Sequence, residues 1–194
     1  MSDNMTAKKD VLRAEALRAR GLLSLSSGED ELFRKLFFGN LKPKEGQIIA
    51  AYWPKGREFD TQSVIDECLE RGLKIALPVV QKDDRILKFA LWDQSIDLIK
   101  GEYGILHPVL DESTEFVSPD IFLVPLLAFD RRGYRLGFGG GYYDTTLAFY
   151  QGEKEISTVG VAYAQQACLF NLPTENHDIR MDWIITQQNA HKYV

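Results

Sequence analysis

Cysteine is scarce in this sequence of 194 residues, which contains only Cys68 and Cys168. The two are far apart and fit neither a Cys-x-x-Cys motif nor the spacing of zinc ligands. A disulfide scaffold is therefore excluded, and we expect a reduced, cytoplasmic protein. Long apolar runs are also missing. None approaches the length of a membrane span, and residues 1–10 lack the hydrophobic core of a signal peptide.

A surplus of basic residues is absent as well, because the formal net charge is −5. This balance argues against a nucleic-acid-binding protein and against a protein of anionic membrane surfaces. An anionic small molecule would therefore need a local group of Arg and Lys side chains. With 45% hydrophobic residues and no internal repeat or low-complexity segment, the chain suits one domain over residues 1–194. We expect a monomer.

Glycine, by contrast, is concentrated in one stretch. An unbroken apolar run over residues 121–127, typical of a strand buried on both faces, leads to Arg135. Four glycines then lie within five positions: Gly137, Gly139, Gly140 and Gly141. Glycines let backbone N–H groups approach a ligand, the N-terminus of the helix expected over residues 143–150 attracts anions, and the Arg135 guanidinium matches phosphate oxygens. The stretch therefore favours an anionic ligand.

This glycine stretch matches neither a P-loop nor a dinucleotide-binding fingerprint. A tight turn from strand to helix is the alternative explanation of the glycines. The neighbouring Arg135, Tyr142, Tyr143 and Asp144 favour a binding site, because they bring charge and hydrogen-bonding groups to the same dozen residues.

A helix is predicted over residues 6–25, because Leu12, Ala16, Ala19 and Leu23 recur at helical spacing. Lys9 and Arg13 lie one turn apart on a different face. Like charges at that spacing repel each other, so the pair mildly favours an anion between them, although a solvated basic face is the alternative. Lys8 leaves the register of this pair open by one residue.

The remaining elements alternate along the chain. Strands are expected over residues 48–52, 74–80, 87–92, 158–163 and 181–186, the third being the more exposed. Further helices are expected from a cap at Ser26 or Ser27 to residue 38, from residue 60 or 61 to 71, and briefly over 165–170. This alternation predicts an α/β fold with a doubly wound, mostly parallel sheet and helices on both faces.

The central stretch also carries a family resemblance. Pro125, Phe129-Asp130, Gly133 and Arg135-Leu136-Gly137-x-Gly139-x-Gly141-Tyr142-Tyr143-Asp144 resemble the signature of the 5-formyltetrahydrofolate cyclo-ligase (methenyltetrahydrofolate synthetase) family. The resemblance implies a three-layer Rossmann-like fold, similar in outline to ribose-phosphate isomerases and CoA transferases. It also implies the ATP-dependent cyclisation of 5-formyltetrahydrofolate to 5,10-methenyltetrahydrofolate, with release of ADP and phosphate, through phosphorylation of the formyl oxygen.

The resemblance further implies roles for individual residues. Lys9, Arg13 and Arg135 would neutralise charge on the phosphates, and Asp144 and Asp178 would hold Mg²⁺. The residues implied for ATP binding also include Leu136, Gly137, Phe138, Gly139, Gly140, Gly141, Tyr142 and Tyr143. Those implied for folate binding are Tyr52, Glu58, Trp92, Phe138, Gly139, Gly140, Gly141 and Tyr142.

Several of these residues have simpler explanations. Glu58 is an ordinary loop acid by sequence alone, Trp92 suits a core position, Tyr143 could attach the loop to the core, and Asp178 could belong to a turn. His107 replaces the acid of the family's glycine–isoleucine–x–acid–proline segment, and we assign it no role. In some relatives a cation lies inside the glycine run, where this chain has Phe138 and Gly140.

Two other classes of function remain open from the sequence. One is a phosphosugar or CoA-ester enzyme of the same fold, which would need a carboxylate base and no ATP. The other is a non-catalytic sensor of folate or nucleotide, which would bind without turnover.

Overall fold

The computed structural model describes residues 2–23 and 28–193. Within them, the main sheet has eight strands in the order β12-β11-β10-β7-β1-β2-β3-β6. Their bounds are β1 Ile48–Ala50, β2 Lys74–Val79, β3 Lys88–Trp92, β6 Phe116–Val117, β7 Ile121–Pro125, β10 Ser157–Val161, β11 Trp183–Ile185 and β12 Ala190–Lys192. The five middle strands, from β11 to β2, run parallel, and the strands at both ends are antiparallel. The sheet is therefore mostly parallel, as predicted.

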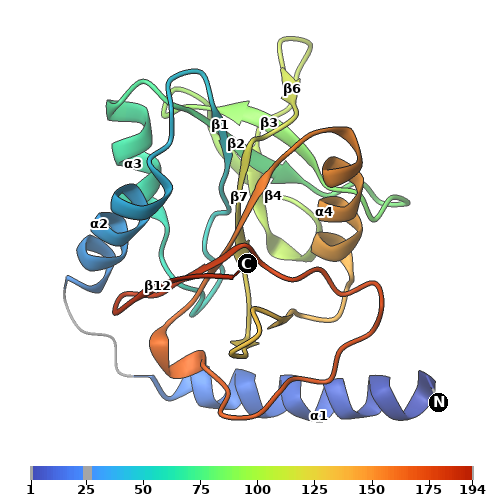
Figure 1. Cartoon of the computed structure of the whole chain (residues 1–194). Coiled ribbons are helices and arrows are strands. Elements are labelled where there is room, and N and C mark those ends of the chain that lie inside the picture. Colours follow the sequence, from blue (N-terminus) through green and yellow to red (C-terminus); the bar gives the residue numbers. More distant parts are fainter. Residues whose placement is uncertain (1, 24–27, 194) are drawn as a thin grey trace.

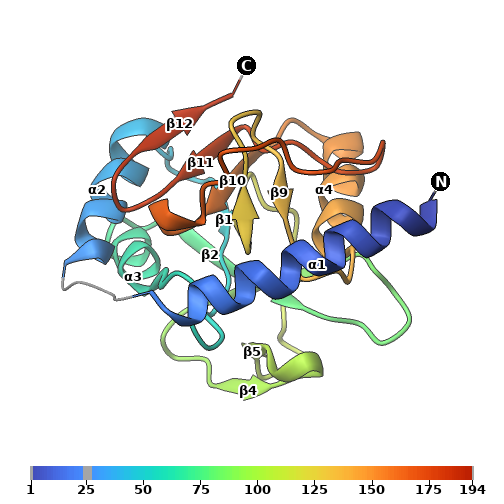
Figure 2. The ribbon, with the colours of Figure 1, turned by 90° about the horizontal axis from the view of Figure 1, so that it is seen from below.

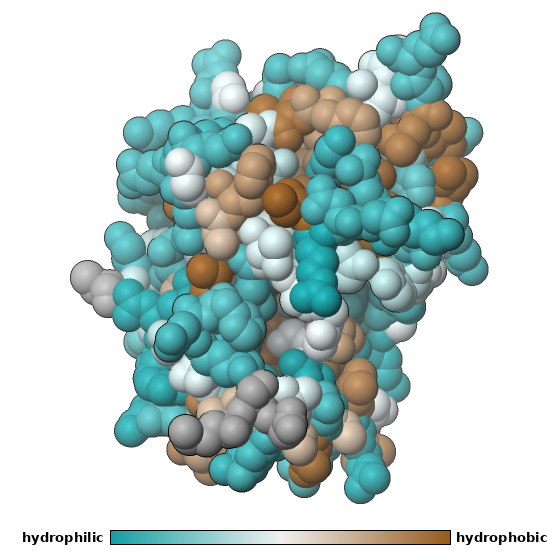
Figure 3. Space-filling view, turned by 90° about the vertical axis from the view of Figure 1, so that its right-hand side faces the viewer, coloured by the Kyte–Doolittle hydropathy of each residue, from teal (hydrophilic) through white to brown (hydrophobic). Residues whose placement is uncertain are grey.

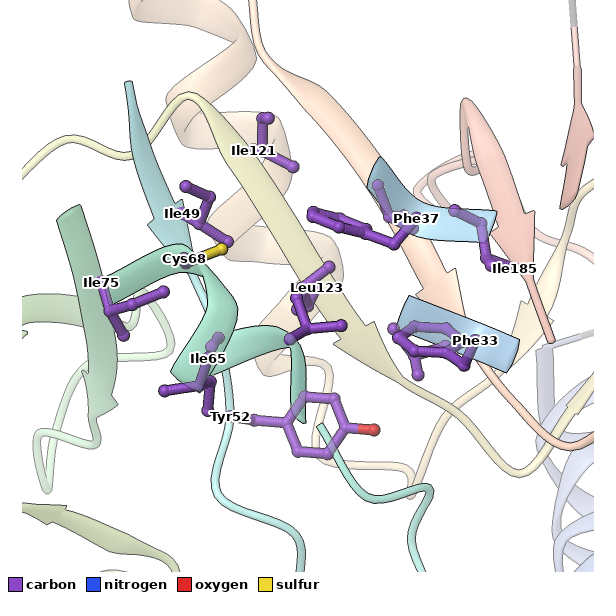
Figure 4. Packing of buried hydrophobic residues seen from close by; sticks show 14 of the residues in the cluster. Phe33, Phe37, Ile49, Tyr52, Ile65, Cys68, Ile75, Ile121, Leu123 and Ile185 are labelled. Atoms are coloured by element: carbon purple, nitrogen blue, oxygen red, sulfur yellow. The ribbon is translucent and has the colours of Figure 1, made fainter. Parts of the chain in front are cut away.

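Helices cover both faces of this sheet (Figure 1). On one face lie α2 (Glu29–Leu41) and α3 (Gln62–Glu70), and on the other lies α4 (Tyr142–Glu153). Figure 4 shows Phe33 and Phe37 of α2 and Cys68 of α3 directed toward strand residues such as Leu123. Removing this apolar surface from water is the main stabilisation of the three layers.

A further helix lies outside the layers. Helix α1 (Ser2–Gly21) runs across the carboxyl ends of the parallel strands (Figure 2). Leu12 and Ala16 of α1 pack against Ala128, Leu136 and Leu172. Since ligands of open α/β sheets gather at this edge, α1 brings its polar residues to the place where a site is expected.

Two small hairpins complete the chain. One pairs β4 (Leu98–Lys100) with β5 (Leu106–Pro108), and the other pairs β8 (Ala128–Phe129) with β9 (Arg135–Leu136). Short 3₁₀ turns occupy Glu102–Gly104 and Ala164–Gln166. None of the helices in the described part of the chain is long and apolar enough to cross a membrane.

Some expected bounds and burials are wrong. Helix α1 spans residues 2–21 rather than 6–25, and the Ser26 or Ser27 cap lies outside the described residues. Strand β3 is largely buried rather than exposed, because it lies between β2 and β6 and its Phe89 packs edge-on against Phe122. The helix expected over 165–170 is only a turn at 164–166, where the Gln166 side chain binds the backbone N–H of Tyr163 and so closes it.

Candidate active site

The hairpin after β7 is held by a buried carboxylate. Asp130 is 1% exposed, and its oxygens accept backbone N–H bonds from Arg132 and Leu172, both at 2.9 Å. The Arg132 guanidinium pairs with the same carboxylate at 2.7 Å. Gly133, at φ +85, has no room for a side chain, because a Cβ there would lie 2.8 Å from the Tyr193 ring. The Asp130–Gly133 part of the motif is therefore scaffold, and it fixes the start of β9 at Arg135.

The glycine loop follows β9 and ends at the N-terminus of α4. Gly141 is the N-cap residue at φ +70, and it provides no side-chain cap for the first N–H groups of the helix. Gly139 has φ +98, and a Cβ there would lie 3.3 Å from Cζ of Arg13. Arg13 Nε also donates to the Gly137 carbonyl at 3.1 Å. The structure thus brings a cation from α1 onto an uncapped helix end, an arrangement suited to an anion.

Two ion pairs bring together four of the residues that the sequence singled out. Lys9 Nζ lies 2.7 Å from Asp178 Oδ2, and it lies 2.8 Å from Oε2 of Glu175. Arg135 Nη2 lies 2.9 Å from Oδ1 of Asp144. Of the two neighbouring lysines, it is Lys9 that faces the acids.

The two ion pairs are directly linked through the backbone. Asp144 Oδ1 accepts the N–H of Ile179 at 2.9 Å, and Arg135 Nη1 donates to the carbonyl of the same residue at 2.9 Å. Ile179 is the neighbour of Asp178 in the chain. The N–H of Ile179 thus joins Asp144 to the residue that follows Asp178, and the two carboxylates belong to one connected network.

Both cations of this network are shielded from water. The Arg135 side chain is 3% exposed and the Lys9 side chain 8%. Burial lowers the pKa of Lys9, but its bonds to Asp178 and Glu175 outweigh this effect and raise the pKa above the ordinary value. Lys9 is therefore a permanent cation at neutral pH.

The donor set is compatible with Mg²⁺. Among the described residues no group of three or more His, Cys, Asp or Glu side chains could hold a metal by itself. Magnesium is ordinarily held by one or two carboxylates, with water and phosphate oxygens as the other ligands. Asp144 and Asp178 supply two such carboxylates beside the helix end. The residues fit an ion that arrives with a phosphate ligand.

Two of the residues expected at the folate lie in the core instead. Tyr52 is buried, and its hydroxyl donates to the Phe59 carbonyl at 2.9 Å. Trp92 is buried against Trp53, and its indole N–H donates to the Ile96 carbonyl at 2.8 Å. Each polar atom already has a protein partner, so the core alternative is favoured for Trp92 and holds for Tyr52 as well.

Glu58, Tyr142 and Tyr143 remain close to the glycine loop. Burial raises the pKa of Glu58, although the N–H of Lys55, at 2.8 Å, and the charge of Arg20 oppose this rise. Burial also raises the pKa of the Tyr143 hydroxyl, which lies within electrostatic reach of both Glu58 and Arg135. The Tyr142 hydroxyl lies 3.1 Å from that of Tyr103. Tyr143 therefore interacts electrostatically with both the Glu58 carboxylate and the ion-pair network.

Three residues near the ion pairs and the Glu58 carboxylate were not predicted from the sequence. Glu175 shares Lys9 with Asp178, and its spacing of three residues from Asp178 was an available signal. Arg20 follows Arg13 by seven residues, two helical turns, so helical periodicity could have placed both on one face. Tyr103, at φ +55 in the 3₁₀ turn, had no signal in the sequence. His107 lies in β5, where its Nδ1 is 2.8 Å from the Pro108 carbonyl.

The fold and the site define an α/β enzyme with an anion-binding helix end at the carboxyl edge of its sheet. A family model described as the 5-formyltetrahydrofolate cyclo-ligase family matches residues 5–187. The chain belongs to this family, so the resemblance seen in the central motif is confirmed. It is accordingly an ATP-dependent cyclo-ligase of folate one-carbon metabolism.

Individual relatives agree over most of the chain. The 5-formyltetrahydrofolate cyclo-ligase of Haemophilus influenzae is 32% identical over 90% of this chain and 95% of that protein. The one from Mycolicibacterium smegmatis is 32% identical over 94% of this chain and 95% of that protein. The solved structure of Aquifex aeolicus 5,10-methenyltetrahydrofolate synthetase is 31% identical, has a TM-score of 0.71, and is matched over 95% of this chain and 92% of that one.

Proposed function

We propose that this enzyme cyclises 5-formyltetrahydrofolate to 5,10-methenyltetrahydrofolate and releases ADP and phosphate. The observation that supports this reaction most directly is the linked pair of ion bridges, Lys9–Asp178 and Arg135–Asp144, at the N-terminus of α4. It provides buried cations for phosphates and two carboxylates for a metal ion within one small region.

The chemistry explains why cations are needed. Ring closure must expel the formyl oxygen, which is a very poor leaving group at neutral pH. When this oxygen attacks the γ-phosphorus of ATP, it becomes part of a phosphate ester, and ADP leaves. The N10 amine then adds to the formyl carbon, and inorganic phosphate departs with the oxygen. No protein nucleophile takes part, so catalysis consists of positioning and charge stabilisation.

The ion pairs would exchange partners when the substrates bind. Lys9, Arg13 and Arg135 would turn from the acids to the phosphate oxygens, and Asp144 and Asp178 would hold Mg²⁺. Bound Mg²⁺ would offset negative charge on the phosphates. The segment from Leu136 to Tyr143, which includes Phe138 and the four glycines, would supply backbone N–H groups and close packing to ATP.

The folate would lie on the other side of the glycine loop. We propose that Glu58, Tyr142 and the Phe138–Gly141 backbone contact it, with Tyr143 between the pterin and the phosphates. Tyr52 and Trp92 lie in the core, and we propose that they act on the folate only by supporting the residues around them.

We further propose that the chain works as one cyclo-ligase domain, as a monomer and in the cytoplasm. In the space-filling view hydrophilic residues cover most of one face and apolar residues form separate groups (Figure 3), which supports a monomer. Cys68 and Cys168 are free thiols, which suits a reducing compartment.

The deciding experiment mixes the protein with 5-formyltetrahydrofolate and Mg-ATP and follows the absorbance of the methenyl product. We expect product only when ATP is present, with one ADP formed for each product. Turnover without ATP would favour an enzyme of the isomerase type, and binding of both ligands without turnover would favour a sensor. Either result would contradict the proposed reaction.

A further inference from the structure

One buried cation has no assigned role. Arg20 lies in the last turn of α1 and is only 7% exposed. Its Cζ lies 5.3 Å from the centroid of the Phe138 ring, in the glycine loop. Its guanidinium forms no hydrogen bond or ion pair with any residue that the structure describes. Since a buried charge is costly without a partner, this guanidinium is suited to a ligand.

The surroundings of Arg20 narrow down the kind of ligand. Arg57 Nη2 donates to the Leu23 carbonyl at 2.7 Å, which ties the loop carrying Glu58 to the end of α1. Burial lowers the pKa of Arg20, and the charge of Glu58 opposes this most strongly among its neighbours. An arginine nevertheless stays protonated at neutral pH. Arg20 thus lies within electrostatic reach of Glu58 without an ion pair between the two, so a ligand could use both.

A ligand that uses both groups must present donors beside an acceptor. The pterin ring of 5-formyltetrahydrofolate has such an edge, with its 2-amino group and N3–H next to the 4-oxo oxygen. A carboxylate can accept from the 2-amino group and N3–H, and a guanidinium can donate to the 4-oxo oxygen. The Phe138 ring, 5.3 Å from Arg20 Cζ, adds a cation–π contact to the guanidinium. A phosphate would suit Arg20 equally well, but it would be repelled by Glu58.

We propose that Arg20 is a specificity-determining residue that donates to the 4-oxo oxygen of the pterin, while Glu58 accepts from the 2-amino group and N3–H. This assignment rests on the proposed function, because it requires the folate to lie beside Glu58. It adds to that function the contact that separates 4-oxo pterins from 4-amino pterins.

The test compares 5-formyltetrahydrofolate with its 4-amino-4-deoxy counterpart, in which an amino group replaces the 4-oxo oxygen and N3 carries no hydrogen. Affinities for both ligands are measured by calorimetry, with magnesium and a non-hydrolysable ATP analogue present. The wild type should prefer the 4-oxo ligand by about tenfold or more, the size of one charge-assisted hydrogen bond. In Arg20→Met the ratio should fall by about tenfold, mainly because the 4-oxo ligand binds more weakly, and any preference that is left comes from the N3–H beside Glu58.

Two further variants separate recognition from structure. Arg18→Met, a change at an exposed arginine of the same helix, should keep the wild-type ratio. Arg20→Lys keeps the charge without the planar fork and should restore part of the preference, so the test stands even if Arg20→Met folds poorly. An unchanged ratio in both Arg20 variants, or weaker binding of the nucleotide analogue alone, would overturn the proposal. Failure of the proposed function would look different, because the wild type would then either not bind 5-formyltetrahydrofolate or bind it without forming the methenyl product.

Discussion

Arg135 connects three parts of the chain through one guanidinium. It extends from β9, pairs with Asp144 in the first turn of α4, and donates to the carbonyl of Ile179 ahead of β11. Because the side chain is almost completely buried, this charge acts in a medium of low dielectric constant, where it is worth more than at the surface. The residue therefore orders the site before substrate arrives.

We expect Arg135→Ala and Asp144→Asn each to lower kcat/KM by about a hundredfold or more, as for the loss of one preorganised charge. Steady-state rates in ATP and folate measure this. Arg131→Ala is a suitable control, because the Arg131 side chain is exposed and donates to Asn171 Oδ1 at 3.3 Å, away from the ion-pair network. Thermal unfolding of each variant shows whether it is folded. Wild-type rates in both variants would refute the assigned roles.

Gly139 tests the glycine loop without removing a charge. Alanine there would be strained by the positive φ of +98 and would lie 3.3 Å from the Arg13 guanidinium carbon. We expect Gly139→Ala to raise the KM for ATP by roughly tenfold, because Arg13 must move away from the phosphates. Gly137→Ala adds a methyl group where no atom lies within 4 Å, so its effect should be much smaller. Equal effects of the two variants would contradict this account.

The site residues differ in how far the sequence could predict them. Arg135 and Asp144 belong to one short motif, so their nearness followed from the chain itself. The bond between Lys9 and Asp178 joins residues 169 positions apart, and only the path of the fold brings them together. Arg20 was missed because a lone arginine in the last turn of a helix usually interacts with the helix dipole or solvent.

Strand β10 packs closely against its neighbours at Gly160. A Cβ at Gly160 would lie 3.0 Å from Leu126 Cδ2 and 3.1 Å from Ile184 Cγ1. We expect Gly160→Ala to lower the free energy of unfolding by about 1–3 kcal/mol through overpacking. In contrast, Gly152→Ala in α4 meets no atom within 4 Å and should raise it by about 0.5 kcal/mol. Urea unfolding measures both, and the same sign for the two changes would be evidence against this packing.

Element lengths explain what sequence patterns could find. The strands β1, β2, β7 and β10 lie in apolar runs, and each was predicted close to its observed position. The hairpin strands β8 and β9 were not, because each has only two residues. They owe their conformation to the buried Asp130 carboxylate and to α1 packing against them, rather than to local propensity.

Helix α1 lies across the carboxyl edge of the sheet. Through Lys9 it is bonded to Asp178, so it connects the N-terminal part of the chain with the C-terminal part. The fold class could be predicted, because alternating strands and helices allow few arrangements. The placement of α1 could not, since its apolar stripe is narrow and its position depends on the hairpin and on the acids of residues 175–178.

A ligand that bridges α1 and α4 should stabilise the entire molecule. At a hundred times its Kd, Mg-ATP should add about 2.7 kcal/mol to the free energy of unfolding, which corresponds to a rise in Tm of roughly 5–10 °C for a chain of this size. Differential scanning calorimetry measures the shift. Lys9→Met should remove most of it, whereas Lys8→Met, which changes an exposed neighbour, should not. A wild-type Tm unaffected by Mg-ATP would count against the bridge.

The linked ion bridges also affect the order in which ligands can enter. A divalent ion alone would have to draw Asp178 away from Lys9 and leave that buried ammonium with Glu175 as its carboxylate partner. A nucleotide alone would bind Lys9 and Arg135 and so take these cations from the carboxylates of Asp178 and Asp144. Under the proposed roles, their joint arrival would give each of the four side chains a partner of opposite charge. The ion pairs of the substrate-free enzyme therefore compete with the binding of either ligand alone. We expect metal and nucleotide to bind with strong mutual synergy.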